Sequence, residues 1–316
     1  MFTVQSEMNS PSTEESYHNN VPLGVITLLA QIVISVGLAG MVKHLSAEVA
    51  LFTILFCRYL FCMPLLLCAG FYQRGWQLFQ INQKRTLIAR IMSGLLGLAS
   101  YFTAIAYLNI STATVLGQTL SLFITLLAPI FLAEKVGFRR LIGVCAGFIG
   151  VVVLINPDSQ GITDYHPIGL FFGILAPLAG AMMFIFLRKL GASEAPISTA
   201  LWYNLTGVFL FLMLLTVFPH HVPDWHLLPS WAVIILICLG VASSFQQFLM
   251  AWSHKLAPAS TLAPVHYTSV PLSIGVGVLF FNDRIGAEFI IGTLILLASS
   301  WYIARREKFR DAGTQR

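Results

Sequence analysis

The sequence predicts an all-α integral membrane protein with ten transmembrane helices, arranged as two inverted five-helix repeats. Two observations predict this class. First, the 316 residues are 57% hydrophobic and only 10% charged, whereas a soluble domain carries roughly 25% charged residues. With a mean hydropathy of +0.81, the chain cannot cover a water-facing surface and belongs in a bilayer. Second, the two halves of the chain share a sequence pattern.

The apolar runs that define the helices each approach the ~20 residues that a spanning helix needs. The ten predicted spans cover residues 22–41, 49–70, 87–107, 112–132, 138–155, 167–188, 198–218, 231–251, 258–281 and 285–304. The connections between them are short, so no soluble domain fits anywhere in the chain.

The two ends of the chain differ in composition from the spans. Residues 1–21 contain no Lys or Arg, so they lack the basic start of a signal peptide. They are predicted to be a disordered cytoplasmic tail, followed by a retained first helix. Residues 305–316 form a basic cytoplasmic tail.

The repeat is visible where "FLAEKVG" (131–137) corresponds to "FFNDRIG" (280–286). Chemistry is kept at each position: Glu134 corresponds to Asp283, 149 positions later, and Lys135 to Arg284. At the same spacing Ser111 corresponds to Ser260. The predicted domains are therefore a first five-helix repeat, 22–156, and a second, 157–304.

Five is an odd number, so the second repeat must cross the membrane upside down relative to the first. Inverted repeats are typical of alternating-access transporters, which bind substrate near the midplane, where the halves meet. This pattern predicts a transporter rather than an enzyme.

The distribution of basic residues predicts the orientation. If both termini are cytoplasmic, all but three of the 18 Lys and Arg residues lie at or beyond the inner membrane face. The exceptions are Lys43 and Arg284 on the outer side and Arg58 within the membrane. The net charge of +5 thus reflects membrane topology, and no nucleic-acid partner is expected.

Several segments resemble EamA modules of the drug/metabolite transporter superfamily. They are "ARIMSGLLGLASYFTAIAYLNISTATVLG" (89–117), "LLAPIFLAEKVGFRRLIGVCAGFIGVVVLINP" (126–157) and, more loosely, "FFNDRIGAEFIIGTLILLASSWYIARR" (280–306). The Arg in the middle of the second helix adds to the resemblance, which covers roughly residues 22 to 305. It implies secondary transport of a small organic molecule across the bacterial inner membrane, through a cavity between two inverted halves.

The resemblance leaves three classes of substrate open. Members are similar to amino-acid exporters and to importers of S-adenosylmethionine or riboflavin. We expect uptake of riboflavin or a similar polar aromatic compound, because an Arg, glutamines and aromatics suit such a ring. Export of amino acids or related metabolites, and S-adenosylmethionine uptake, are the alternatives.

Arg58 is the most informative single residue, because it is a charge within the apolar run "LFTILFCRYLFC" (51–62). At 1.5 Å per residue it lies roughly 12–14 Å from Val49, near the midplane of the bilayer. A charge there must face the bundle interior or a wet cavity. It is therefore a candidate substrate-binding residue, with a structural bond to neighbouring carbonyls as the alternative.

Other polar or aromatic side chains at midspan are candidates for the same site, since polar groups in lipid must face protein or water. For His266, hydrogen-bonded packing is the alternative, as lipid contact is for the aromatics. The remaining candidate substrate-binding residues are Tyr101, Gln118, Trp202, Tyr203, Gln246, Gln247, His266 and Tyr267.

Glu134 and Asp283 stand in tight turns just before a helix, where a carboxylate favours the positive helix N-terminus. A structural role is therefore expected for both. No Asp or Glu lies deep in any predicted span, so His266 is the only candidate for proton coupling. A facilitator or exchanger is the preferred interpretation.

The sequence gives no support for a cofactor, a metal centre or catalysis. The five cysteines lie in apolar runs without a CxxC pattern. A membrane-embedded enzyme is the rival class, and its candidate residues, His220, His221, His226 and Asp224, share one loop. The GxxxG patterns at 143–147 and 169–173 favour packing within the bundle, with a homodimer as the alternative.

Overall fold

The computed structural model describes residues 20–132, 138–155, 166–190, 194–224, 228–257, 262 and 265–314. Its elements are α1 (Val21–Leu45), α2 (Leu51–Arg74), η1 (Gly75–Phe79), α3 (Lys84–Tyr107), α4 (Ile110–Gly117), α5 (Leu120–Leu132), α6 (Phe138–Ile155), α7 (Pro167–Leu190), α8 (Pro196–Val217), η2 (Pro219–His221), α9 (Ser230–Leu256), α11 (Ser269–Phe281) and α12 (Ala287–Thr314). No strand occurs in these residues, which confirms the all-α class.

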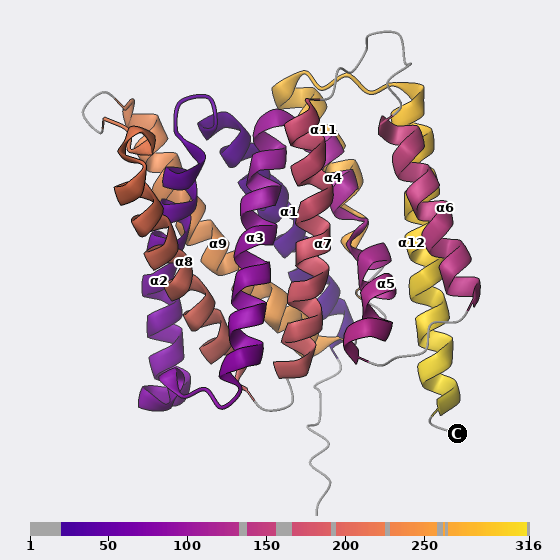
Figure 1. The fold of residues 1–316 in the computed structure, drawn as a ribbon, viewed down its shortest axis with the longest axis horizontal. Coiled ribbons are helices and arrows are strands. Elements are labelled where there is room, and N and C mark those ends of the chain that lie inside the picture. The colour runs from indigo at the N-terminus through magenta and orange to yellow at the C-terminus, as the bar shows by residue number, and fades with distance from the viewer. Residues whose placement is uncertain are drawn as a thin grey trace, which may run out of the picture.

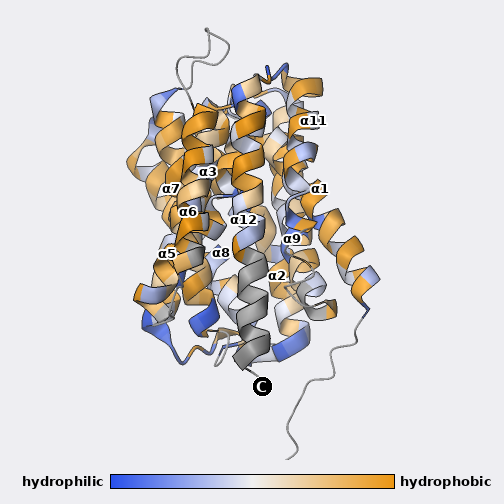
Figure 2. Ribbon diagram, turned by 90° about the vertical axis from the view of Figure 1, so that its right-hand side faces the viewer, coloured by the Kyte–Doolittle hydropathy of each residue, from blue (hydrophilic) through white to orange (hydrophobic). Residues whose placement is uncertain are grey.

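The helices agree with the predicted spans in place, but not all in length. Seven of the described segments are long and apolar enough to cross a membrane. Shorter apolar helices, at 141–155, 269–281 and 287–303, coincide with three further predicted spans. Apolar residues cover the helices along their middle, and hydrophilic residues gather at the two ends (Figure 2).

Local sequence explains where several helices begin and end. The side chain of Asn20 accepts a hydrogen bond from Leu23 N at 3.2 Å, and the proline that follows Val21 suits a first turn. Gly75 ends α2 with a φ of +54°, a conformation that glycine adopts without strain. Asn282, also at +54°, ends α11 in the left-handed conformation that asparagine tolerates.

The two predicted spans at 112–132 and 258–281 are interrupted. The first is divided into α4 and α5 by a turn at Gln118 and Thr119. In the second, a turn at Tyr267 and Thr268 precedes α11. These two turns are 149 positions apart, the spacing of the sequence repeat.

The main helix contacts join the N-terminal half of the chain to the C-terminal half. The closest pairings are α3 with α7, α6 with α12, α1 with α9, and α2 with α8 and α9. The α6–α12 pair lies side by side at one edge of the molecule (Figure 1). The largest core cluster joins residues of both halves, from Leu38 to Ile303.

Glycines allow several of these pairs to come close. A Cβ on Gly147 would meet Leu122 and Ser299, and one on Gly173 would meet Leu116. Both GxxxG patterns of the sequence therefore face helices of the same chain, as the packing interpretation predicted.

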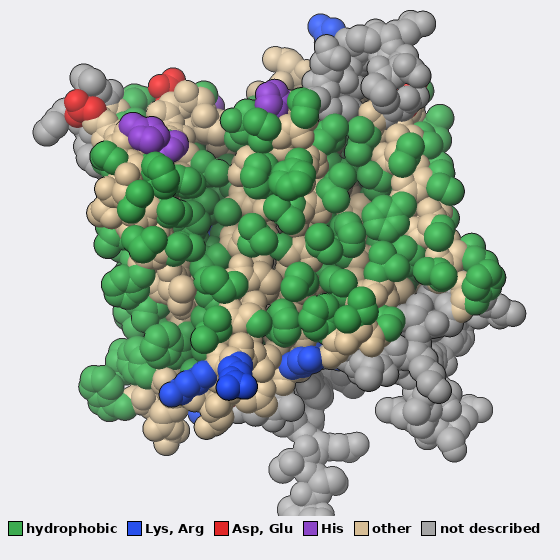
Figure 3. All heavy atoms as spheres, in the orientation of Figure 1, with side chains coloured by type: hydrophobic (Ala, Val, Ile, Leu, Met, Phe, Trp, Pro, Cys, Tyr) green, Lys and Arg blue, Asp and Glu red, His purple; other side chains and the backbone are tan. Residues whose placement is uncertain are grey.

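The two ends of the molecule carry different charges. The start of α1 and the end of α12 lie at one end (Figure 1), where Lys and Arg side chains gather, whereas His and acidic side chains appear at the other end (Figure 3). Basic residues at this end include Arg74, Lys84, Arg85 and Lys189. We call it the basic end.

Candidate functional site

Arg58 lies on α2 and is buried inside the bundle, with only 6% of its surface exposed. Its guanidinium carbon is 5.0 Å from the centre of the Tyr59 ring and 5.9 Å from that of Phe102 on α3. Its Nε and Nη1 atoms have no hydrogen-bond partner. The charge therefore faces protein rather than lipid, but two of its donor atoms are not used.

Tyr59, the next residue of α2, connects Arg58 to α8. Its hydroxyl lies 2.8 Å from that of Tyr203, and Tyr203 Oη donates to Gly94 O of α3 at 3.4 Å. The Tyr59 ring is fully buried and stacks on Phe211 at 5.8 Å. This hydroxyl pair joins a helix of each half.

Arg90 on α3 is a second buried cation, 8% exposed. Its guanidinium carbon lies 4.7 Å from the centre of the Tyr203 ring. Nη1 donates to Thr199 O at 3.3 Å, and Nε has no partner. Our interpretation of the sequence assigned Arg90 to the charge of the inner face, whereas the structure places it inside the bundle.

We call Arg58, Tyr59, Arg90 and Tyr203 the arginine–tyrosine cluster. Cation–π contacts contribute about 0.5–2 kcal/mol each, whereas a charge at the centre of a spanning helix costs about 2.5–3.5 kcal/mol on insertion scales. A single ring contact therefore offsets only part of the cost. The acidic side chains that the structure describes lie at or beyond helix ends: Glu48, Glu194, Asp224, Asp283 and Glu288.

A second polar group forms where the two interrupted helices meet. Gln118 Nε2, at the first break, donates to Ser269 Oγ at the start of α11, at 3.0 Å. Ser121 Oγ lies 3.0 Å from Ser300 Oγ of α12, and Tyr267, at the second break, lies near the same Ser300. We call Gln118, Ser121, Tyr267, Ser269 and Ser300 the break cluster.

The other predicted residues lie in different places around these two clusters. Tyr101 on α3 lies near Thr114 of α4. Gln247 of α9 lies 3.7 Å from Cys62 Sγ, one helical turn along α2 from Arg58. Gln246 and His266 are half-buried.

Trp202 does not join either cluster. Its indole Nε1 donates to Phe79 O at 3.3 Å, at the end of η1 near the basic end. This contact has a structural reason, because the buried part of an indole needs a partner for its N–H.

Asp283 holds the halves together at the end opposite the basic end. Its Oδ2 accepts hydrogen bonds from Ser111 Oγ at 2.9 Å and Ser111 N at 3.4 Å, at the start of α4. Lys43 Nζ, nearby, donates to Ala106 O and Leu108 O. The carboxylate therefore caps a helix of the other half, not α12, which follows it. Its counterpart Glu134 lies outside the described residues.

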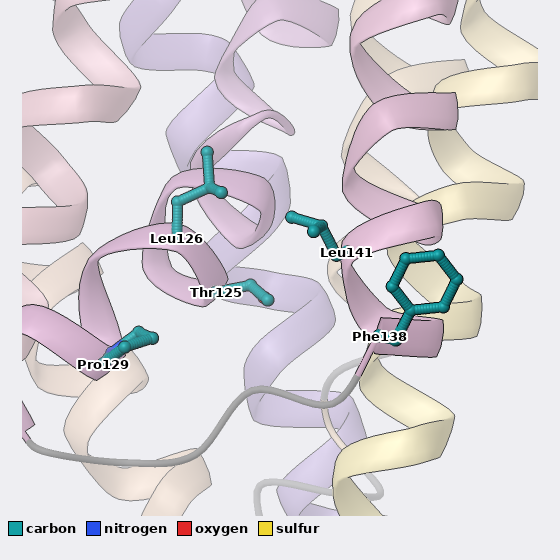
Figure 4. A pocket seen from close by; sticks show the side chains of 5 residues that line it. All are labelled: Thr125, Leu126, Pro129, Phe138 and Leu141. Carbon is teal, nitrogen blue, oxygen red and sulfur yellow. The ribbon is translucent and has the colours of Figure 1, made fainter.

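An apolar cleft of about 410 Å³ lies between α5 and α6, lined by Thr125, Leu126, Pro129, Phe138 and Leu141 (Figure 4). Among the residues that the structure describes, this lining contains no charged side chain and only one hydroxyl. Such a surface suits lipid chains rather than a polar metabolite.

A model of the EamA-like transporter family matches residues 22–156 and again residues 167–305. The chain belongs to the EamA-like transporter family. The two matches repeat one EamA module in tandem, and each module contains one interrupted helix. The arginine–tyrosine cluster takes three residues from the first module and Tyr203 from the second.

Curated relatives of this EamA protein have names of transporters. It is 25% identical over 286 residues to an S-adenosylmethionine uptake transporter of Rickettsia bellii, covering 90% of this chain and 94% of the relative. It is 27% identical over 239 residues to a riboflavin transporter of Vibrio cholerae, covering 74% and 73%. An uncharacterized transporter of Helicobacter pylori is 25% identical over 227 residues, covering 70% and 73%.

A solved crystal structure has a similar fold, with a TM-score of 0.59 at 16% sequence identity. The match covers 90% of this chain and 98% of that chain. At this identity the likeness concerns the fold alone.

Sequence reasoning missed two members of the arginine–tyrosine cluster. Arg90 follows Lys84 and Arg85 closely in the sequence, so the pattern of charges groups it with the basic residues of the inner face. It lies, however, six positions further along the helix than Lys84. Its depth of about 9 Å, at 1.5 Å per residue, was the available signal. Tyr59 gave no signal, because a tyrosine in an apolar helix is usual.

Proposed function

We propose that the chain is a secondary transporter that moves a small organic metabolite across the bacterial inner membrane by alternating access. It crosses the membrane ten times, in two inverted five-helix halves, with both termini in the cytoplasm. The gathering of Lys and Arg at the basic end supports this orientation, because cytoplasmic loops carry an excess of basic residues.

The helix pairings support the inverted arrangement. If the two halves are exchanged, α1 becomes α7 and α9 becomes α3, so the α1–α9 pair becomes the α7–α3 pair. The α2–α8 and α6–α12 pairs are unchanged by the exchange. All of these are observed contacts, as a two-fold axis between the halves requires. With five spans in each proposed half, that axis lies in the membrane plane.

The observation that carries the proposal is the pair of helix breaks, 149 positions apart and joined by Gln118 and Ser269. Interrupted helices at the interface of two repeats form the substrate and ion sites of secondary transporters. The breaks give a site that both halves build, which alternating access requires.

Riboflavin, or a similar polar aromatic compound taken up by the cell, is the best candidate for the substrate. The free N–H donors of Arg58 match the carbonyl oxygens on the imide edge of a flavin ring, and the neighbouring Tyr59 and Phe102 supply aromatic surface. A relative named as a riboflavin transporter supports this choice.

S-adenosylmethionine uptake is the alternative, supported by a relative of that name that covers more of the chain. Its sulfonium is cationic, and two buried arginines disfavour a cation. Export of amino acids or related metabolites is a third candidate function.

An enzyme is disfavoured because both halves match a transporter family. The glycines of both GxxxG patterns pack against other helices of the same chain, so they give no support to a homodimer.

Growth rescue tests the function. The full chain, an Arg58→Ala variant and an Arg74→Ala control would be expressed in a riboflavin auxotroph that lacks its own importer, on limiting riboflavin. Arg74 is a matched arginine whose Nη1 donates to Ser198 Oγ at the basic end. We expect rescue by the intact chain and by the control, but not by Arg58→Ala.

Rescue by all three proteins would keep the substrate but remove Arg58 from the site. No rescue, with the protein present in the membrane, would contradict flavin uptake. Labelled S-adenosylmethionine uptake would then be measured in the same cells.

A further inference from the structure

The arginine–tyrosine cluster contains two buried positive charges and no negative charge. The contacts of Arg58 and Arg90 that the structure describes are all with neutral groups: the rings of Tyr59, Phe102 and Tyr203 and the carbonyl of Thr199. A buried charge without a counter-charge is strongly destabilising. Among the residues that the structure describes, the cluster therefore lacks a partner of opposite sign.

The free hydrogen-bonding capacity of the cluster is one-sided. Arg58 Nε, Arg58 Nη1 and Arg90 Nε are buried donors without acceptors. Tyr203 Oη donates to Gly94 O, and the two tyrosine hydroxyls bond to each other. Within this cluster, the unsatisfied groups are therefore cationic N–H donors, which require an acceptor.

The two guanidinium groups each contact one ring of the Tyr59–Tyr203 pair. Arg58 lies over Tyr59 and Arg90 over Tyr203, while the ring centres are 5.5 Å apart. The cluster is built by α2 and α3 of one half and α8 of the other. A ligand bound here would thus contact both halves, as a transported substrate must.

We propose that Arg58 and Arg90 together bind an anionic group, a carboxylate or a phosphate, and that this group belongs to the transported substrate. The inference rests on the proposed function and extends its substrate class from riboflavin, which carries no charge, to polar aromatic metabolites with an anionic substituent. Arginine suits this role because its planar donors match carboxylate and phosphate oxygens. An inorganic anion such as chloride is the other source of the same chemistry.

The test compares pairs of probes in which one member has an anionic group that the other lacks. Flavin mononucleotide is riboflavin with a phosphate, and nicotinate is the anionic counterpart of nicotinamide. Dissociation constants would be measured by isothermal titration calorimetry on the purified full chain in detergent, in methanesulfonate buffer with and without chloride. The proteins are the natural chain, Arg58→Gln, Arg90→Gln and the control Arg74→Gln.

We expect at least one anionic probe to bind about tenfold more tightly than its neutral counterpart to the natural chain and to the control. The preference should be lost in Arg58→Gln and in Arg90→Gln. Arg58→Lys and Arg90→Lys, which keep the charge without the planar donors, should retain part of it. These variants also serve if a Gln variant does not fold.

Equal affinity for the anionic and neutral probes would overturn the proposal, as would a preference that survives in both Gln variants. No binding of any probe or of chloride would overturn it too. Chloride that binds alone and displaces the anionic probe, only when both arginines are present, would keep the anion site and assign it to an inorganic ion.

The binding test is independent of flux. If the anionic preference is absent while riboflavin-dependent growth is rescued, the anion inference fails and flavin uptake stands. If growth is not rescued while the arginine-dependent preference is present, flavin uptake fails and the anion site stands.

Discussion

At the scale of single residues, the absence of a side chain at one glycine allows the arginine–tyrosine cluster to form. The Tyr59 ring lies directly against α8 at Gly207, where a Cβ would come 2.7 to 2.9 Å from three ring carbons. Glycine is required there because the ring fills the space of its missing side chain. The hydroxyl bond to Tyr203 depends on this close approach.

Gly207→Ala should therefore lower the stability of the protein. Overpacking of a well-packed core costs about 1–3 kcal/mol. The Tyr59 ring also contacts Tyr203 and Phe211, so it has little room to shift. Gly37→Ala in α1 is the matched control, because nothing lies within 4 Å of a Cβ there. Thermal unfolding in detergent should show a lower Tm for Gly207→Ala and no decrease for Gly37→Ala. An unchanged Tm for Gly207→Ala would mean that the ring is not confined.

Asp283 and Ser111 should be energetically coupled, because they connect the two halves through buried hydrogen bonds. Bonds to a charged group contribute about 1.5–3 kcal/mol. A double-mutant cycle with Asp283→Asn and Ser111→Ala, followed by thermal unfolding, should give a coupling within the 0.5–3 kcal/mol found for residues in contact. Strictly additive effects would show that the contact does not hold the halves.

The residues of the site were predictable to different degrees. Arg58 could be found because a charge within an apolar run has no structural explanation on a lipid face. Arg90 could not, because its neighbours Lys84 and Arg85 made it appear to be part of the basic end. The position of Trp202 within a predicted span did not bring it into either cluster. Its N–H donates to Phe79 O instead.

At the scale of helices, the α6–α12 pair shows how close backbone contact is achieved. A Cβ on Gly150 would meet Gly292 O and Leu296 N, both at 2.9 Å. These are backbone atoms, which cannot rotate away as a side chain can. The two helices pack more closely with each other than with the rest of the bundle.

Gly150→Ala should consequently separate the pair and destabilise the protein by more than a side-chain clash would. Gly275→Ala in α11 is the control, because its Cβ would meet nothing within 4 Å. We expect the Tm of Gly150→Ala to fall clearly below that of the control, with both compared in detergent. If the two variants unfold at the same temperature, the close contact of α6 and α12 is not maintained.

The positions of the helices followed from hydropathy, but the interruption of the fourth span did not. Residues 112–132 form one apolar run, and the turn at Gln118 and Thr119 contains no proline. It is stabilised by a tertiary contact, from Gln118 to Ser269, which local sequence cannot reveal. The break at Tyr267 was easier to expect, since Pro264 and Pro271 flank it.

At the scale of the whole molecule, the proposed inverted arrangement fixes which connections lie on each side of the membrane. The connection after α2 contains Gln77, which is exposed near the basic end, and Arg284 is exposed at the other end. The proposed topology puts Gln77 in the cytoplasm and Arg284 outside it.

Single cysteines at Gln77 and Arg284, in a chain without its five natural cysteines, should react differently with an impermeant maleimide. Arg284→Cys should be labelled in intact cells or spheroplasts, whereas Gln77→Cys should be labelled only after permeabilisation. The reverse pattern would invert the orientation. Labelling of both from one side would refute the proposed topology.

The central claim is that this chain moves a small organic molecule across a bilayer through a site that both halves build. The most direct test is uptake of labelled riboflavin into sealed proteoliposomes that contain the natural chain, Arg58→Ala or Arg74→Ala. We predict time-dependent accumulation that saturates with the natural chain and with Arg74→Ala, and that is lost with Arg58→Ala. Riboflavin that binds to the natural chain but never enters the vesicles would contradict the claim and indicate a receptor instead.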